Sequence, residues 1–196
     1  METNDASFRA VFIYSKGYKR QLLMSWKDIE TLSKFIKNTI KQEVTIINTN
    51  LGLDIYYVSP VDMKAFICKS FLLLHAIKGH KETDFNIISL ASHQEIKQYL
   101  YHAYLHWTKM PLLLKSYLKS FVIQLNRDYL HNITINSLLF SVWYANLKQI
   151  RTRIGGQLDR KGIILMDTLQ ELYLDQNYNP LEKSFIKEAL HESHHN

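Results

Sequence analysis

Helix-start signals recur along the chain from Ser59 onward and constrain its fold more than any other feature. Ser59-Pro60-Val61-Asp62 combines an N-cap residue, a proline suited to the first helical turn and an acidic residue. Ser92 to Glu95 is a capping box, and Asn179-Pro180-Leu181-Glu182 repeats the first pattern. These three patterns, together with other proline, threonine and glycine signals along the chain, predict six helices. The predicted helices cover residues 60–78, 92–109, 111–130, 134–154, 159–175 and 180–191.

The chain before residue 59 follows a different pattern. Phe8 to Tyr14 and Gln21 to Ser25 flank a polar connector with a glycine, which predicts a hairpin of two strands. Apolar residues at helical spacing then predict a helix that begins after Ser25 and ends near Gln42. Two segments rich in β-branched and aromatic residues, Val44 to Ile47 and Asp54 to Val58, predict a second hairpin.

The predicted fold class is therefore α+β. A small N-terminal ββαββ sheet subdomain, residues 1–59, packs on a mainly α-helical bundle of about six helices, residues 60–196. Four short strands and one helix bury too little apolar surface to be stable alone, so we expect one compact unit. The segment from Asp84 to Leu90 fits either a helical turn or a short strand, and this choice stays open.

Composition excludes several classes of protein. With 196 residues, 46% of them hydrophobic, and only 6 Gly and 3 Pro, the chain can bury a sizeable core and is neither disordered nor collagen-like. The single cysteine, Cys68, excludes an intramolecular disulfide. Residues 129–147 carry no charge but include seven polar side chains, so no membrane span is predicted. The polar N-terminus shows no export signal, which predicts a cytoplasmic protein.

Lysine outnumbers arginine 18 to 6, and isoleucine, asparagine and tyrosine are abundant. This bias is typical of an AT-rich coding genome and indicates a microbe or one of its mobile elements.

A basic group with two glycines is the strongest functional signal. Its cations surround the break at Gly155 and Gly156, and only Asp159 opposes them within the group; they are Lys148, Arg151, Arg153, Arg160 and Lys161. Glycines at a helix junction let backbone amides approach a phosphate, and the cations neutralise its charge. The alternative is structural, because cations in the last turn of a helix also complement its dipole.

A second basic group lies at the tip of the first predicted hairpin. Lys16, Lys19 and Arg20 surround Tyr18, an aromatic residue able to stack on a base. A charged hairpin tip is equally typical of any sheet that avoids edge-to-edge aggregation.

Histidine pairs raise the question of a metal site. His191 to His195 matches H-E-x-x-H, but it nearly ends the chain, where no later segment supplies a third ligand. His102 and His106 lie one turn apart on a predicted helix and are weak candidates for a shared metal. Phosphate-loop, nucleophile-elbow and C-x-x-C motifs are missing from the sequence. No catalytic residue, metal or cofactor is therefore predicted.

These observations favour a non-enzymatic binding protein whose partner is nucleic acid, with a regulatory, replication or defence accessory role. The alternative is a protein–protein interaction factor, an inhibitor or assembly subunit, because 12 Tyr and 3 Trp supply many amphipathic contact residues. Its expected contact face is the tyrosine-rich helix from Tyr99 to Tyr104. A third hypothesis, a metal-dependent enzyme at His102 and His106, requires a ligand from another helix.

Overall fold

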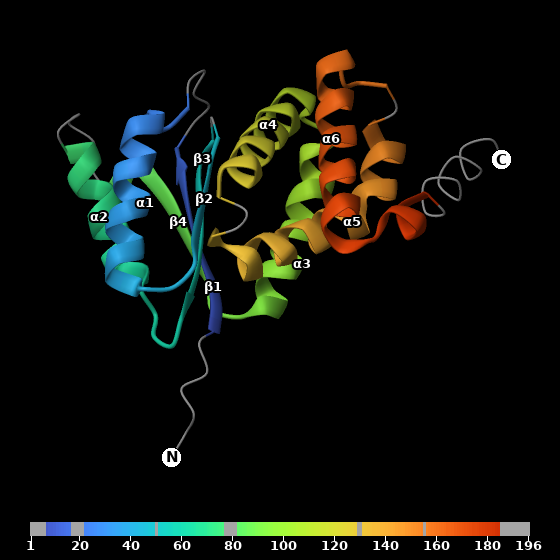
Figure 1. The fold of residues 1–196 in the computed structure, drawn as a ribbon. Coiled ribbons are helices and arrows are strands. Elements are labelled where there is room, and N and C mark those ends of the chain that lie inside the picture. The colour runs from blue at the N-terminus through green and yellow to red at the C-terminus, as the bar shows by residue number, and fades with distance from the viewer. Residues whose placement is uncertain are drawn as a thin grey trace.

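The computed structural model describes residues 7–16, 22–49, 51–76, 82–128, 131–154 and 156–184. Within them the chain forms a four-stranded sheet with helices on both faces (Figure 1). The elements in chain order are β1 (Ser7–Ser15), α1 (Trp26–Ile40), β2 (Val44–Asn48), β3 (Gly52–Ser59), α2 (Lys64–Ala76), the 3-10 helix η1 (Glu82–Asp84), β4 (Phe85–Leu90), α3 (His93–Trp107), α4 (Pro111–Asp128), α5 (Ile133–Ile154) and α6 (Arg160–Asn177). Residues 180–184 are also helical.

The sheet has the strand order β2-β3-β1-β4, and every neighbouring pair is antiparallel. Strand β1 is central, since Val11 lies opposite Ile55 of β3 on one side and Ser89 of β4 on the other. Strand β2 forms one edge of the sheet, next to α1 and α4.

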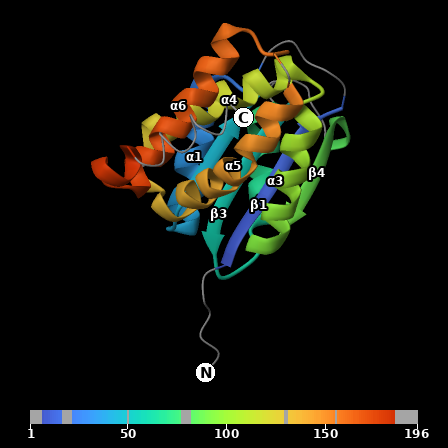
Figure 2. The same ribbon diagram turned by 90° about the vertical axis from the view of Figure 1, so that its right-hand side faces the viewer.

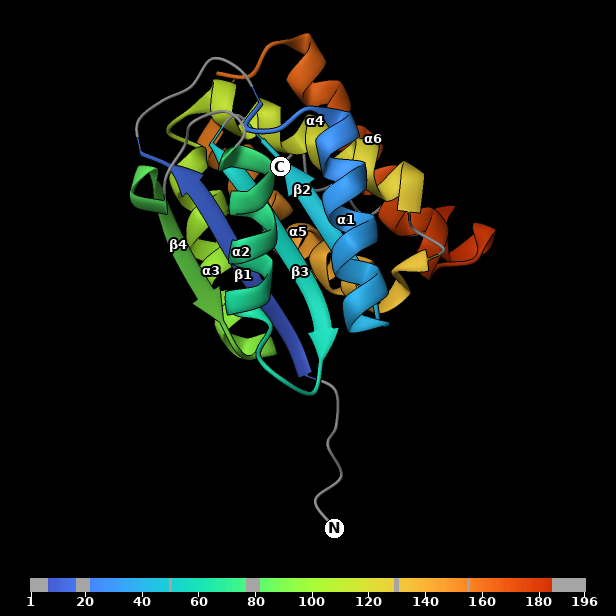
Figure 3. The same cartoon turned by 90° about the vertical axis from the view of Figure 1, so that its left-hand side faces the viewer.

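Alternating residues of the central strands enter two separate cores. Phe12 and Tyr56 pack with the large helical group, whereas Val11 and Ile55 pack with α1 and α2. Figure 3 shows α1 and α2 covering one face of the sheet, and Figure 2 shows α3 and α5 covering the other. The result is three layers, with a sheet that is apolar on both faces.

Aromatic side chains fill the core of the large helical group. Trp143 of α5 is fully buried, and its ring meets the ring of Tyr104 from α3 at a centroid distance of 5.4 Å. Tyr117 and Phe121 bring α4 into the same cluster. Since α4 and α5 also contact β2, this core joins the helices to the sheet.

The α+β fold class predicted from the sequence is confirmed, with the sheet at the N-terminal end and the helical group after it. The hairpin of Val44 to Ile47 with Asp54 to Val58 is confirmed as β2 and β3. The open segment from Asp84 to Leu90 is mostly strand, as β4. Because β4 belongs to the sheet, the sheet extends past residue 59, and the division of the chain at that point stays a prediction.

The predicted strand from Gln21 to Ser25 is wrong for its described residues, 22–25. Buried Met24 packs in the core beneath α1, its carbonyl accepts a hydrogen bond from Asn48 Nδ2 at 2.9 Å, and Ser25 caps α1. Strand β1 pairs instead with β3 and β4. The helix predicted from Pro60 begins later, at Lys64, whose backbone N–H donates to Asp62 Oδ1 at 2.8 Å.

Among the described residues, no helix combines the length and apolar character needed to cross a membrane.

Candidate nucleic-acid interface

The junction between α5 and α6 is a short, well-anchored turn. Helix α5 ends at buried Ile154, whose carbonyl accepts a hydrogen bond from Gln157 N at 2.9 Å. Gly156 has a φ of +84°, a conformation that glycine adopts without strain. Leu158 returns to the core, and Asp159 caps α6 by accepting from Gly162 N at 2.9 Å. The described residues of this junction, 156–159, therefore contact the ends of both helices.

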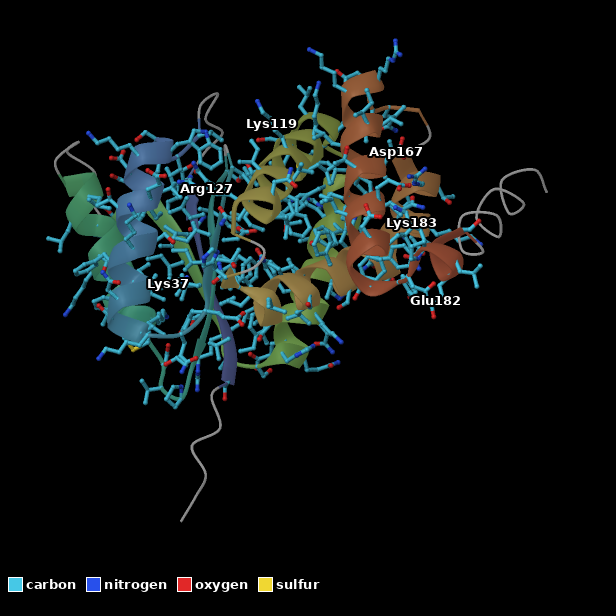
Figure 4. All side chains as sticks on the ribbon, viewed as in Figure 1. Lys37, Lys119, Arg127, Asp167, Glu182 and Lys183 are labelled. Atoms are coloured by element: carbon cyan, nitrogen blue, oxygen red, sulfur yellow. The ribbon has the colours of Figure 1, made fainter. Side chains whose placement is uncertain are left out.

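Arg151 of α5 links the two helices at this junction through hydrogen bonds to α6. Its Nη2 donates to Asp167 Oδ1 at 2.6 Å and to Gln170 Oε1 at 3.0 Å, so the guanidinium joins α5 to α6. Asp167 is labelled on α6 in Figure 4. Among the described residues, Arg151 is the one of the five predicted cations that forms an ion pair within 4.0 Å, and its geometry matches a structural role.

Lys115 of α4 forms an ion pair with Asp159 at the same junction. Its ammonium lies 2.5 Å from Asp159 Oδ2. The hydrogen bond from Lys115, and then that from Gly162 N, lower the pKa of Asp159. Asp159 is thus an ionised cap with its own counter-ion, and the one acidic residue of the basic group is already neutralised.

The other four cations of the group are exposed. Lys148 and Arg153 lie on the last turns of α5, and Arg160 and Lys161 open α6. Within the described part of the chain, none of the four has an ion-pair partner within 4.0 Å. We call these four residues the junction surface. Exposed Lys119, labelled in Figure 4, lies one turn beyond Lys115 on α4.

The second basic group is only partly described. Lys16 follows β1 and is exposed, and its backbone N–H donates to Asp84 O at 2.9 Å. Lys19 and Arg20 lie outside the described residues. Their predicted role with Lys16 in binding nucleic acid stays a prediction.

The histidine pair is exposed on α3. His102 lines a shallow cavity with residues of α3 and α5, including Tyr101 and Asn146, and its ring contacts that of Tyr101. Across the described ranges, no three His, Cys, Asp or Glu side chains gather in a way that would hold a metal ion. His102 and His106 therefore receive no converging ligand from the described part of the molecule.

A buried polar cluster on the sheet was not anticipated from the sequence. Asp54 of β3 is 1% exposed, and its Oδ1 accepts a hydrogen bond from Tyr14 Oη at 2.9 Å. Tyr99 Oη donates to Tyr14 Oη at 3.1 Å, which links α3 to the cluster. Burial raises the pKa of Asp54 to about 7, although the hydroxyls of Tyr14 and Tyr56 act in the opposite direction. The available signal was Asp54 itself, the one charged residue in an otherwise apolar strand.

The comparisons with known proteins contribute no functional argument: no family model matches this chain, and neither a curated protein nor a solved structure matches it.

Proposed function

We propose that this protein is a non-enzymatic nucleic-acid-binding protein whose junction surface contacts the phosphate backbone. The observation that carries the proposal is the set of four exposed cations around one turn, none of which forms an ion pair within 4.0 Å among the described residues. Cations placed in this way release counter-ions from nucleic acid when they neutralise its phosphates.

The position of two of these cations favours a partner over a capping role. Arg153 lies near the C-terminus of α5, where a positive charge stabilises the helix dipole. Arg160 and Lys161 instead occupy the first turn of α6, where the dipole disfavours positive charge. Helix stability therefore explains Arg153 but not Arg160 or Lys161, whereas an anionic ligand explains all three.

The experiment that tests the proposal is fluorescence anisotropy with labelled duplex DNA, single-stranded DNA and RNA, each measured across a salt series. We expect binding by at least one probe, with an affinity that falls steeply as salt rises. Absence of binding by all three probes at low salt would overturn the proposal. The cytoplasmic setting and the microbial or mobile-element origin expected from the sequence stay predictions.

Protein–protein interaction is the second candidate function, but its contact face differs from the tyrosine-rich helix expected from the sequence. Tyr104 is fully buried and Tyr99 is half-buried, so the tyrosine-rich helix presents only Tyr101 as an exposed tyrosine. Exposed apolar side chains lie instead at the N-terminal ends of α4 and α6, where Leu112 is 74% and Ile164 is 52% exposed. If every nucleic-acid probe fails, these side chains are the surface to test by substitution.

A further inference from the structure

A cavity of about 190 Å³ lies at the β2 edge of the sheet, away from the junction surface. Helix α1, strand β2 and the C-terminal end of α4 form its walls. Figure 3 shows α1 beside β2, with α4 behind them. The polar side chains that matter here are Glu30, Lys34, Lys37, Arg127, His131 and Asn132. We call this site the edge cavity.

The charged side chains of the edge cavity are mostly positive. Lys34 and Lys37 come from α1, and Arg127 comes from α4; Figure 4 labels Lys37 and Arg127. Glu30, the one acidic side chain among the described lining residues, forms an ion pair with Arg127 Nη2. Within the described ranges neither lysine has an ion-pair partner within 4.0 Å. Two positive charges therefore remain uncompensated around a small space.

A buried amide adds a neutral donor with a fixed orientation. Asn132 is 2% exposed, and its Oδ1 accepts a hydrogen bond from Val44 N at 3.3 Å. Because a backbone N–H can only donate, the atom facing Val44 must be the amide oxygen. The Nδ2 group is then the remaining polar end of the side chain, and it can only donate. Asn132 thus favours an acceptor, as the two lysines do.

We propose that the edge cavity binds the phosphate group of a small phosphorylated molecule. Lysine ammonium groups, guanidinium N–H groups and a side-chain amide are the donors that a phosphate recognises. Apolar Ile29 and Ile46 line the same space, which suits a small organic group attached to the phosphate. The volume is below the roughly 300 Å³ of a typical drug-sized pocket, which matches a compact ligand.

This site is independent of the proposed nucleic-acid contact. Arg127 lies near the C-terminal end of α4, whereas Lys115, which contacts Asp159 at the junction, lies in its N-terminal half. Phosphate from a nucleic-acid backbone shares the same chemistry, so the experiment must separate the two sources.

Isothermal titration calorimetry with inorganic phosphate, pyrophosphate and ribose 5-phosphate, at constant ionic strength, tests the inference. We expect the Lys34→Gln/Lys37→Gln variant to lose at least about tenfold in affinity for the tightest of these probes. The control variant Lys27→Gln/Lys69→Gln removes two exposed cations from α1 and α2 outside the cavity and should keep the affinity. Equal affinity in all three proteins, or no binding of any probe to the unmodified chain, would overturn the proposal.

A second variant tests the buried donor. Asn132→Asp keeps an acceptor for Val44 N but replaces the amide donor with a carboxylate, so it should abolish phosphate binding. Undiminished binding by a folded Asn132→Asp protein would contradict the role of Asn132; if this variant does not fold, the lysine variant still decides the proposal.

Short single-stranded DNA identifies the source of the phosphate. If it competes with pyrophosphate, and Lys34→Gln/Lys37→Gln weakens both ligands together, a nucleic-acid backbone occupies the cavity and the small-molecule proposal is overturned. If pyrophosphate binding survives in an Arg153→Gln/Arg160→Gln protein and DNA does not compete, the small phosphorylated ligand is supported. These outcomes are distinguishable from failure of the junction surface, which leaves the phosphate titration unchanged.

Discussion

The Tyr14 hydroxyl of β1 donates a hydrogen bond of 2.9 Å to Asp54 Oδ1 of β3, inside the interface between the sheet and the large helical group. The hydroxyl of Tyr56 also lowers the pKa of Asp54, but neither it nor Asp54 Oδ2 makes a hydrogen bond of ordinary geometry among the described residues. Burial makes the ionised form of this carboxyl group unfavourable, and the hydrogen bond from Tyr14 offsets only part of that cost. The folded protein therefore favours the protonated form of Asp54.

Asp54 should make the stability of the protein pH-dependent. Its pKa is about 7 in the folded protein, against an ordinary value of 3.8, so the folded chain holds a proton that the unfolded chain releases. The free energy of unfolding should then fall as pH rises from about 4 to about 7, by about 1.4 kcal/mol per unit, and level off above that range.

The Asp54→Asn variant isolates this contribution, because it keeps the shape and the acceptor for Tyr14 but cannot ionise. Urea denaturation at several pH values measures the free energy of unfolding of both proteins. Between about pH 4 and about pH 7, the value for the variant relative to that of the unmodified protein should rise by about 4 kcal/mol. Parallel stability curves for the two proteins would show that Asp54 titrates normally.

Tyr104 and Tyr117 form a buried hydroxyl pair between α3 and α4, with oxygens 3.2 Å apart. Replacing either one with phenylalanine leaves the other hydroxyl without its partner, at a cost of about 1–2 kcal/mol in the free energy of unfolding. The double Tyr104→Phe/Tyr117→Phe variant removes both groups and should cost no more than one single substitution. Chemical denaturation of the three variants measures this coupling. Additive losses would mean that the hydroxyls do not satisfy one another.

Arg151 and Arg153 should behave differently although they are two residues apart. Arg151→Gln breaks the contacts with Asp167 and Gln170 and should lower the free energy of unfolding by about 0.5–1 kcal/mol, a modest value because the pair is partly exposed. Arg153→Gln should change it by less than about 0.5 kcal/mol. Conversely, only Arg153→Gln should reduce the salt dependence of nucleic-acid binding. Thermal or urea denaturation beside anisotropy separates the two roles, and a reversed pattern would refute the assignment.

The features predicted correctly from the sequence are local. Ser25, Ser92 and Asn179 accept hydrogen bonds from backbone N–H groups three residues later, at 3.2, 3.3 and 3.0 Å, and such caps are visible in a short stretch of sequence. The β2–β3 hairpin is local in the same sense, because its strands are close in the chain.

The features that were missed depend on distant partners. Strand β4 pairs with β1 through contacts such as Val11 with Ser89, which no local pattern encodes. Met24 belongs to a strand-like sequence, but its side chain packs with α1 and its carbonyl accepts a hydrogen bond from Asn48. The edge cavity needs α1 and the end of α4 to meet at β2, and the contact of Arg151 with Asp167 depends on the packing of α6 beside α5.

The salt dependence of nucleic-acid affinity is the most direct test of the central claim. Arg153→Gln/Arg160→Gln removes two cations of the junction surface, and Lys64→Gln/Lys69→Gln removes two exposed cations from α2, on the opposite face of the sheet (Figure 1). For duplex DNA, each lost phosphate contact should reduce the slope of log affinity against log salt by about 0.9. We expect the junction variant to lose about 1.8 from the slope and the α2 variant to keep it. Equal slopes in the two variants would contradict a junction surface that binds nucleic acid.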